Sequence, residues 1–275
     1  MCSSDLGGST GTGTDTGTTT PPGSGGGTSP LPPGGANSGN AADALWGESF
    51  FAPSVDMGLY PVPDLDGLAH QHGVGLFPLG FIQATSSGEA AWAGLSALSL
   101  TSSNSQAVAL RQEIRQLQAV GGDAMVSFGG VSGASASDLA KRYGQVVDTL
   151  ALNRIDFDIE GAALANRAAN TLLANSLKLL QHSDPTLEVW DTLPVLPQGL
   201  TADGLTVVRQ ALTAGVKLDG INIMAMDDGD SAAPPAQPSM GQYAIDAAKA
   251  SFRQLSRSEE HTSELQSPCN LVCRL

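Results

Sequence analysis

Positively charged side chains are scarce in this chain. Its 275 residues include 13 Lys and Arg against 27 Asp and Glu, which gives a formal net charge of −14 at pH 7. Nucleic acids and anionic membrane surfaces are bound by clustered cationic side chains, so this balance argues against both as partners. No apolar run approaches the roughly 18 residues that a membrane-spanning helix needs, and we recognise no intact signal peptide in the sequence.

Cysteine is almost absent. The three that occur all lie close to an end of the chain, at Cys2, Cys269 and Cys273. This distribution argues against a disulfide framework and against a structural zinc site. We therefore expect neither a metal nor a cofactor.

Residues 7–40 consist almost entirely of Gly, Thr, Pro and Ser, with Leu31 as the only large apolar side chain. Such a segment buries too little surface to offset the conformational entropy lost on ordering. The composition therefore predicts a disordered linker, flexible where it is rich in Gly and stiffer where it is rich in Pro.

The two extremities differ in character from the rest of the chain. Residues 257–275, which read RSEEHTSELQSPCNLVCRL, resemble the in-frame translation of a sequencing-library adapter, and residues 1–6, MCSSDL, resemble the end of the partner adapter. We predict that both are artefacts and exclude them from fold reasoning. The folded domain is then expected within residues 41–256.

Strand and helix patterns alternate through this domain. Short apolar or β-branched runs predict strands at Phe50–Leu59, Leu76–Gln83, Ala124–Phe128, Ile155–Ile159, Leu187–Leu193 and Gly220–Met226. Helical patterns lie between them, at Asn104–Ala119, Ala136–Leu150, Ala165–Gln181, Thr201–Ala214 and Gln242–Leu255. Alternating β and α elements favour a parallel sheet. The α/β candidates at this point are a doubly wound sheet and a (β/α)8 barrel.

The most informative stretch is Arg154–Gly161, which reads RIDFDIEG. Successive side chains of a strand point to opposite faces, so Asp156, Asp158 and Glu160 share one face. Phe157 and the isoleucines lie on the other face, which we expect to pack under the helices. Like charges inside a parallel sheet are costly, and the usual relief is a shared proton with one raised pKa. A carboxylic acid that stays protonated near neutrality can act as a general acid.

Two other readings of these residues are weaker. A D-x-D-x-E strand can bind Mg²⁺ or Ca²⁺ through its oxygens. The sequence contains no Walker-type G-x-x-x-x-G-K-[ST] motif and no second acidic cluster that would complete a phosphoryl-transfer site, which disfavours a metal. Ser127 has no adjacent base, so a serine hydrolase is unsupported.

Several motifs carry a resemblance to a known family. Asp156–Glu160 resembles the D-x-D-x-E signature of glycoside hydrolase family 18, the chitinases and endo-β-N-acetylglucosaminidases. Val126–Gly130 (VSFGG) is similar to the S-x-G-G strand of that family, and Ile221–Asp227 (INIMAMD) to its sixth-strand motif. Phe51–Asp56 and Thr192–Pro197 also resemble the bacterial chitinase branch. The similarity runs over essentially all of residues 50–255.

The resemblance implies a (β/α)8 barrel with its site at the carboxyl ends of the strands. A complete barrel has eight strand–helix units in about 250 residues, whereas about six units are visible here. We therefore predict a TIM barrel that is truncated on its C-terminal side after about six units.

The resemblance also implies roles for the three acids. Glu160 is expected to protonate the glycosidic oxygen, Asp158 to orient and stabilise the substrate's N-acetyl group, and Asp156 to share a proton with Asp158. The acetamido oxygen of the substrate then acts as the nucleophile, which is the substrate-assisted exception to the two-carboxylate scheme. Carboxylates that are neighbours on one strand agree with this, because they cannot lie on both sides of a sugar ring.

Further residues are expected to contact the substrate. These candidates are Gln83, Trp92, Ser127, Gly129, Gly130, Met224, Met226 and Asp227. The chain departs from the family at Met226, where a tyrosine often binds the acetamido group, with Asp228 at the nearby alternative position. It also has Asn153 where the fuller signature has Asp, a change at the barrel base that we expect to matter little.

Together these assignments predict a secreted, extracellular chitinase. It is expected to act as a monomer on chitin or N-acetylglucosamine oligosaccharides, with no nucleic acid or membrane as partner. Residues 7–40 then fit the linkers that join such enzymes to carbohydrate-binding modules. An endo-β-N-acetylglucosaminidase acting on N-glycans and a non-catalytic chitin-binding lectin are the alternatives left open.

Overall fold

The computed structural model describes residues 45–47, 50–130, 135–226, 229, 231, 240–260 and 270–274. Its centre is a curved sheet with the strand order β1–β2–β4–β5–β6–β8–β9, paired in parallel throughout. These strands are β1 (Val55–Asp56), β2 (Leu76–Ala84), β4 (Asp123–Gly130), β5 (Arg154–Asp158), β6 (Glu188–Leu196), β8 (Leu218–Met224) and β9 (Asn270–Arg274). Two short strands, β3 (Ala90–Trp92) and β7 (Gly199–Leu200), pair antiparallel with β2 and β6.

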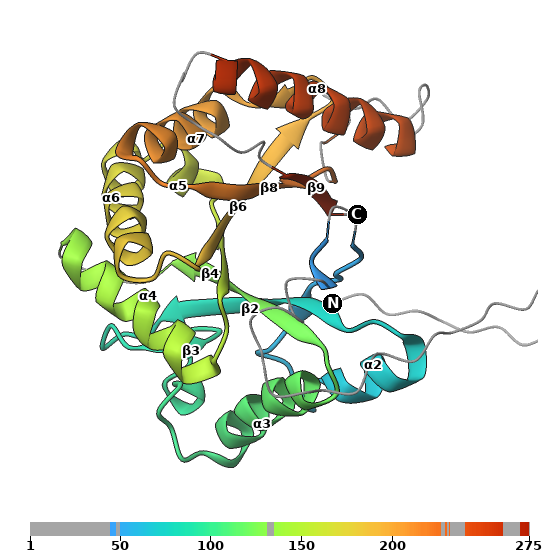
Figure 1. Cartoon of the computed structure of the whole chain (residues 1–275), viewed down its shortest axis with the longest axis vertical. Helices are drawn as coiled ribbons and strands as arrows, with labels where there is room; N and C mark the ends of the chain where they lie inside the picture. Colours follow the sequence, from blue (N-terminus) through green and yellow to red (C-terminus); the bar gives the residue numbers. More distant parts are fainter. Residues whose placement is uncertain are drawn as a thin grey trace, which may run out of the picture.

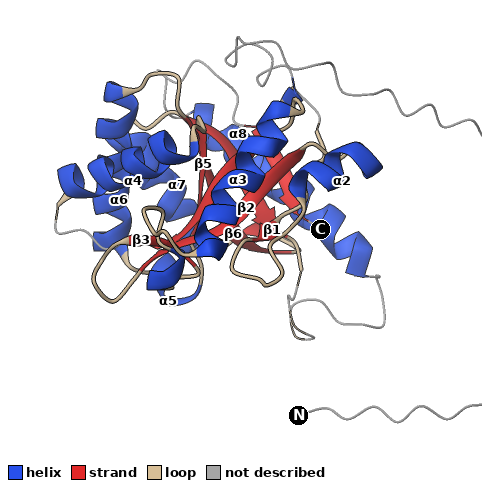
Figure 2. Ribbon diagram, turned by 90° about the horizontal axis from the view of Figure 1, so that it is seen from below, coloured by secondary structure: helices blue, strands red, loops and turns tan. Residues whose placement is uncertain are grey.

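Helices surround the outer face of this sheet (Figure 1). They are α2 (Leu65–His72), α3 (Ser105–Ala119), α4 (Ala136–Leu150), α5 (Gly161–Leu164), α6 (Arg167–Ser183), α7 (Ala202–Ala214) and α8 (Met240–Glu260), with a 3-10 turn η1 (Ser96–Leu98). Figure 2 shows the red strands enclosed by these helices from a perpendicular direction. None of the helices in the described ranges is long and apolar enough to cross a membrane.

The strand order decides between the two candidate architectures. A doubly wound sheet has a switch point at which the order reverses. Here each new parallel strand is added on the same side as the chain proceeds, so no reversal occurs among the described strands. A singly wound parallel sheet with its helices outside is a barrel wall. The barrel prediction is therefore confirmed, and the doubly wound alternative is wrong.

The wall does not close into a ring. Parallel pairing runs continuously from β1 to β9, and within the part of the chain that the structure describes no pairing joins these two strands. Figure 1 shows the ribbon ring interrupted between β9 and the blue N-terminal segment. Both β1 and β9 are therefore edge strands.

Local sequence explains where the helices begin and which face they bury. Five of the described helices start at a side-chain oxygen that accepts a backbone N–H of the first turn, contributed by Asp64, Asn104, Ser135, Asn166 and Thr201. Such caps stabilise a helix by about 1 kcal/mol each. In α3, Leu110, Ile114 and Leu117 recur at helical spacing and are all buried, so this stripe packs on the sheet.

The expected element list matches the structure closely, with local differences. The first strand is shorter than expected, since β1 covers two residues of the range 50–59. The short helix α2 and the hairpin strand β3 were not expected. The predicted boundary after residue 256 falls inside α8, which continues to Glu260, and Asn270–Arg274 pairs in parallel with β8. Residues 1–44, with the predicted linker, lie outside the described residues.

A buried ion cluster joins the amino-terminal ends of β4, β5 and β6. Arg154, which is 1% exposed, donates to Asp123 at 2.9 Å and to both carboxylate oxygens of Glu188 at 2.8 Å. The indole of Trp46 donates to Asp123 at 2.7 Å, and its ring lies 5.4 Å from the guanidinium carbon. Burial raises the pKa of Asp123 against the effect of these donors. Removing one member of a buried ion pair costs about 3–5 kcal/mol, so the cluster holds three strands together at the base of the wall.

Gly220 is required by the side chain beside it. The ladder between β6 and β8 sets Trp190 opposite Gly220, and Trp190 is 3% exposed. A Cβ atom added at position 220 would overlap the six-membered ring of the indole. Only a residue without a side chain fits at this place in the ladder.

We expect Gly220→Ala to lower the free energy of unfolding by about 1–3 kcal/mol, the usual cost of overpacking a buried site. Urea unfolding followed by circular dichroism measures the change. Gly241→Ala is the matched control, because an added Cβ there meets no atom within 4 Å and alanine is favoured over glycine in a helix by up to about 1 kcal/mol. Equal midpoints for the two variants would contradict the role given to Gly220.

Candidate active site

Charged side chains follow one another along the lumen face of β5, and their exposure rises toward its carboxyl end. Arg154 and Asp156 are buried, Asp158 is half-buried and Glu160 is exposed. The strand ends at Asp158, but Glu160 keeps an extended backbone with φ −140° and ψ 175° before α5 begins. The Ile159 N–H also continues the hydrogen-bonded ladder to β6. The three acids therefore lie on the common face that the alternation predicts.

Asp156 is completely buried and is held by two hydroxyl groups. The Ser127 hydroxyl on β4 donates to Asp156 Oδ2 at 2.5 Å, and the Thr192 hydroxyl on β6 donates to Oδ1 at 2.6 Å. Hydrogen bonds of this kind favour the ionised carboxylate. Ser127 itself is 1% exposed, so the prediction that it contacts substrate is wrong: burial leaves its hydroxyl to position Asp156.

A cavity of about 550 Å³ lies beside Asp158, the middle member of the acid row Asp156, Asp158 and Glu160. Asp158 lines it together with Met224 and Met226. Contact of the two methionines with a substrate stays a prediction. Phe50, Phe51, Phe81, Met125, Trp190 and Asn222 form further parts of the lining. A largely apolar and aromatic cavity with few polar groups suits a ligand that has apolar faces and a small number of hydrogen-bonding sites.

Gln83 and Gly129 meet at the carboxyl ends of β2 and β4. Gln83 is exposed, and a Cβ added at Gly129 would come within 2.9 Å of its Nε2 atom. Gly130 pairs with Gln83 in the ladder between these strands. The glycines thus allow the glutamine to lie across the end of β4. Contact of these three residues with a substrate stays a prediction.

Trp92 does not have the role that was expected of it. It lies on β3, is 1% exposed and belongs to the main hydrophobic core. A ring buried to this extent presents no face on which a sugar could stack, so that prediction is wrong. The hairpin of β2 and β3, which folds the tryptophan inward, has no sequence signal strong enough to reveal it. Asp227 and Asp228 lie outside the described residues, and their contacts stay predictions.

Asp191 is a titratable residue that the sequence analysis missed. It lies on β6 between Trp190 and Thr192, so strand alternation turns it away from the lumen toward the helix layer. It is 1% exposed, and neither of its carboxyl oxygens has a hydrogen-bond partner among the described residues. Burial, with a smaller contribution from the charge of Asp156, raises the pKa of Asp191 to about 7. The sequence did contain a signal for this residue, because an acid lies inside the apolar run that predicts the strand Leu187–Leu193.

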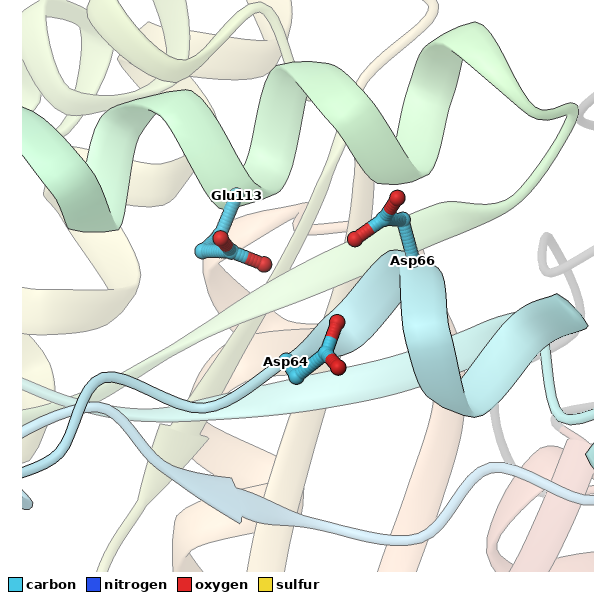
Figure 3. A group of neighbouring side chains, drawn as sticks. All are labelled: Asp64, Asp66 and Glu113. Atoms are coloured by element: carbon cyan, nitrogen blue, oxygen red, sulfur yellow. The ribbon is translucent and has the colours of Figure 1, made fainter. Parts of the chain in front are cut away.

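A second group of acids gathers away from β5, where α2 begins. Figure 3 shows Asp64, Asp66 and Glu113 turned toward one another, and this is the one group of possible metal ligands found among the described residues. Asp64 accepts the Gly67 N–H at 2.9 Å, and Glu113 accepts the Leu65 N–H at 3.2 Å. Negative charge stabilises a helix amino terminus, so capping of α2 accounts for the group. Sequence spacing did not reveal it because its members come from two helices.

Comparisons with known proteins agree with this geometry. No family model matches the chain. The probable bifunctional chitinase/lysozyme of Escherichia coli (strain K12) is 34% identical over 199 residues, and Endochitinase 11 of Metarhizium anisopliae is 34% identical over 197 residues. Each match covers 68% of this chain but only 21% and 36% of these curated relatives, so the chain spans a minor part of their length.

Solved structures give a longer match. The catalytic domain of a hyperthermophilic chitinase from Pyrococcus furiosus superimposes with a TM-score of 0.66 and 30% identity, over 82% of this chain and 72% of that domain. Catalytic-site mutants of the same chitinase complexed with chito-oligosaccharides match with the same TM-score, identity and coverage.

A barrel wall that carries a row of acids at the carboxyl end of one strand is typical of an α/β-barrel enzyme, whose site lies at that end of the strands. The identity to the Pyrococcus furiosus domain and the share of that domain covered narrow this further. The chain belongs to the chitinases of the glycoside hydrolase family 18 type.

The raised pKa of Asp191 predicts how stability depends on pH. Below about pH 4 the carboxyl is protonated in both the folded and the unfolded chain, so it costs nothing. Between its unfolded value of 3.8 and its folded value of about 7, the folded chain binds more protons, so stability falls as pH rises. The full cost, up to about 4 kcal/mol, is reached above pH 7.

We expect Asp191→Asn to remove this loss, so that the variant is more stable than the wild type at pH 8 and of similar stability at pH 4. Urea unfolding at a series of pH values measures the difference. An equally steep fall in stability for both proteins between pH 4 and pH 7 would contradict it.

Proposed function

We propose that this chain is the catalytic part of a chitinase that cleaves β-1,4 bonds between N-acetylglucosamine units by substrate-assisted, retaining catalysis. The observation that carries the proposal is the graded row on β5, in which a buried Asp156 lies behind a half-buried Asp158 and an exposed Glu160. Support also comes from the relatives, whose names describe chitinases and chito-oligosaccharide complexes.

The position of each acid suits one step. Glu160, at the mouth of the site, donates its proton to the glycosidic oxygen as the bond to the anomeric carbon breaks. The acetamido oxygen of the same sugar forms the new bond to that carbon, giving an oxazolinium ion. Asp158 stabilises the positive charge of this ion. Water then attacks the anomeric carbon as its bond to the acetamido oxygen breaks, which regenerates the N-acetyl group, and the water gives a proton back to Glu160, which restores the acid.

Spacing along the strand favours the substrate as nucleophile. Residues two positions apart on a strand are separated by roughly 7 Å and lie on one face, so Asp158 and Glu160 approach a bound sugar from the same side. A protein nucleophile or a base for an inverting water requires a carboxylate on the opposite side of the ring. The half-buried Asp158 lines the cavity, where an acetamido group fits beside Met224 and Met226.

We also propose that the enzyme acts outside the cell as a monomer. Chitin is an insoluble polymer that cells degrade externally, and the composition of residues 7–40 suits a tether between secreted domains. Analytical sedimentation of the purified chain measures its state of association. A stable dimer would contradict the monomer.

Glu160→Gln keeps the shape of the side chain and removes the acid, so we expect kcat on soluble chito-oligosaccharides to fall by about 10²–10⁴ while the oligosaccharides still bind. Glu89→Gln is the matched control, since Glu89 is also exposed but lies on the loop between β2 and β3. Release of reducing ends measures the rate, and calorimetry measures binding. Oligosaccharides that bind the wild type but are never cut would favour the lectin alternative.

Substrate assistance predicts two further results with the wild type. Fully deacetylated chitosan should not be cleaved, because it lacks the oxygen that attacks the anomeric carbon. The first reducing ends should have the β-configuration, since two displacements at that carbon retain it. NMR of early products measures the anomer. Early α-anomer, or rapid cleavage of the deacetylated polymer, would require a water or enzyme nucleophile.

A further inference from the structure

A chain of hydrogen bonds reaches Asp156 from two neighbouring strands. Asn222 of β8 donates from Nδ2 to Thr192 Oγ1 at 3.2 Å, and Thr192 of β6 donates to Asp156 Oδ1 at 2.6 Å. The ladder aligns Thr192 with Asn222. All three residues are buried, at 2%, 0% and 0% exposed, so each bond is made away from water.

The donors in this chain have a fixed direction. A side-chain amide nitrogen donates and does not accept, so Thr192 Oγ1 is the acceptor of the Asn222 bond. The single hydroxyl hydrogen of Thr192 is thereby directed at Asp156. Ser127 supplies a second hydroxyl hydrogen at the other carboxyl oxygen. Two donors on one carboxyl group favour its ionised form.

Other charges around Asp156 make such donors necessary. Asp158 lies two residues ahead on the same strand face, and the carboxyl of Asp191 on β6 interacts unfavourably with Asp156. Arg154 lies two residues behind, but its guanidinium is paired with Asp123 and Glu188. The hydroxyl of Thr192 therefore offsets part of this repulsion.

We propose that Thr192 and Asn222 are positioning residues that hold Asp156 ionised and fixed, so that the proton available to the three acids stays off Asp156 and with the acids nearer the reacting groups, where Glu160 uses it. This inference rests on the proposed function for its catalytic consequence and on the hydrogen bonds alone for its effect on Asp156.

The catalytic consequence is tested with Thr192→Val, which keeps the shape of the side chain and removes the hydroxyl. We expect kcat to fall about 10- to 100-fold, the range for one hydrogen bond to a charged group, with KM changed by less than about threefold. Thr192→Ser should restore kcat. The matched control is Ser176→Ala, which removes a buried hydroxyl that donates to Leu173 within α6 and should leave kcat unchanged. A loss in kcat for Ser176→Ala as large as for Thr192→Val would overturn the assignment.

A double-mutant cycle tests whether Asn222 acts through Thr192. Asn222→Leu alone should lower kcat by less than Thr192→Val, because it leaves the hydroxyl in place but free to rotate. In the Thr192→Val background the same change should lower kcat by less than it does in the wild type, since the hydroxyl that Asn222 orients is gone. Effects on kcat that multiply would show that Asn222 does not act through Thr192 and would overturn its part in the proposal.

A measurement on the full chain without substrate separates this proposal from the proposed function. The carboxyl ¹³C resonance of Asp156, identified by its loss in Asp156→Asn, is followed against pH. Its ionisation midpoint should rise in Thr192→Val and stay unchanged in Ser176→Ala. An unchanged midpoint in Thr192→Val overturns the proposed role of Thr192, whether or not the variant is active. If the midpoint rises in Thr192→Val but the wild-type chain does not cut chitin, the role of Thr192 is supported and the proposed function is rejected.

Discussion

Burial of the Asp156 carboxyl group is the constraint on which this part of the barrel depends. A carboxyl group that is 0% exposed is favoured in its ionised form where donors meet both of its oxygens. Those donors come from β4 and β6, on either side of β5. A slip of one residue in either neighbour would turn the hydroxyl to the other face of the sheet. The chemistry of the site and the register of three strands are therefore set by the same few atoms.

Much of the fold and of the acid row could be predicted from the sequence, because both follow from short-range periodicity. Alternation of two residues gave the face shared by Asp156, Asp158 and Glu160. The succession of apolar runs and helical stripes gave a parallel α/β sheet, and the resemblance to glycoside hydrolase family 18 implied that this sheet is a barrel wall. The predictions that were wrong concern residues whose surroundings are set by contacts between distant segments. Trp92 was expected to contact the substrate because its hairpin was not recognised. Ser127 was expected to do the same, although its hydroxyl is buried and bonded to Asp156.

Asp191 is a residue whose importance comes from the hydrogen-bond donors that its surroundings do not supply. Its strand position could be predicted, but its burial without a partner among the described residues depends on how the helices cover β6. The same holds for Gly220, whose lack of a side chain only gains meaning when the Trp190 ring is seen across the ladder. Sequence patterns report which face a residue takes and do not report what is packed against it.

The ion cluster at the base of the wall has a consequence for which saccharides the lumen accepts. The positive charge of Arg154 is neutralised by Asp123 and Glu188 at the closed end of the strands, so it does not reach the mouth. The carboxylates farther along β5 therefore give the open end a negative potential. A negative potential at that end favours neutral amide-bearing sugars over polymers of uronic or sialic acids, which carry a negative charge on each unit.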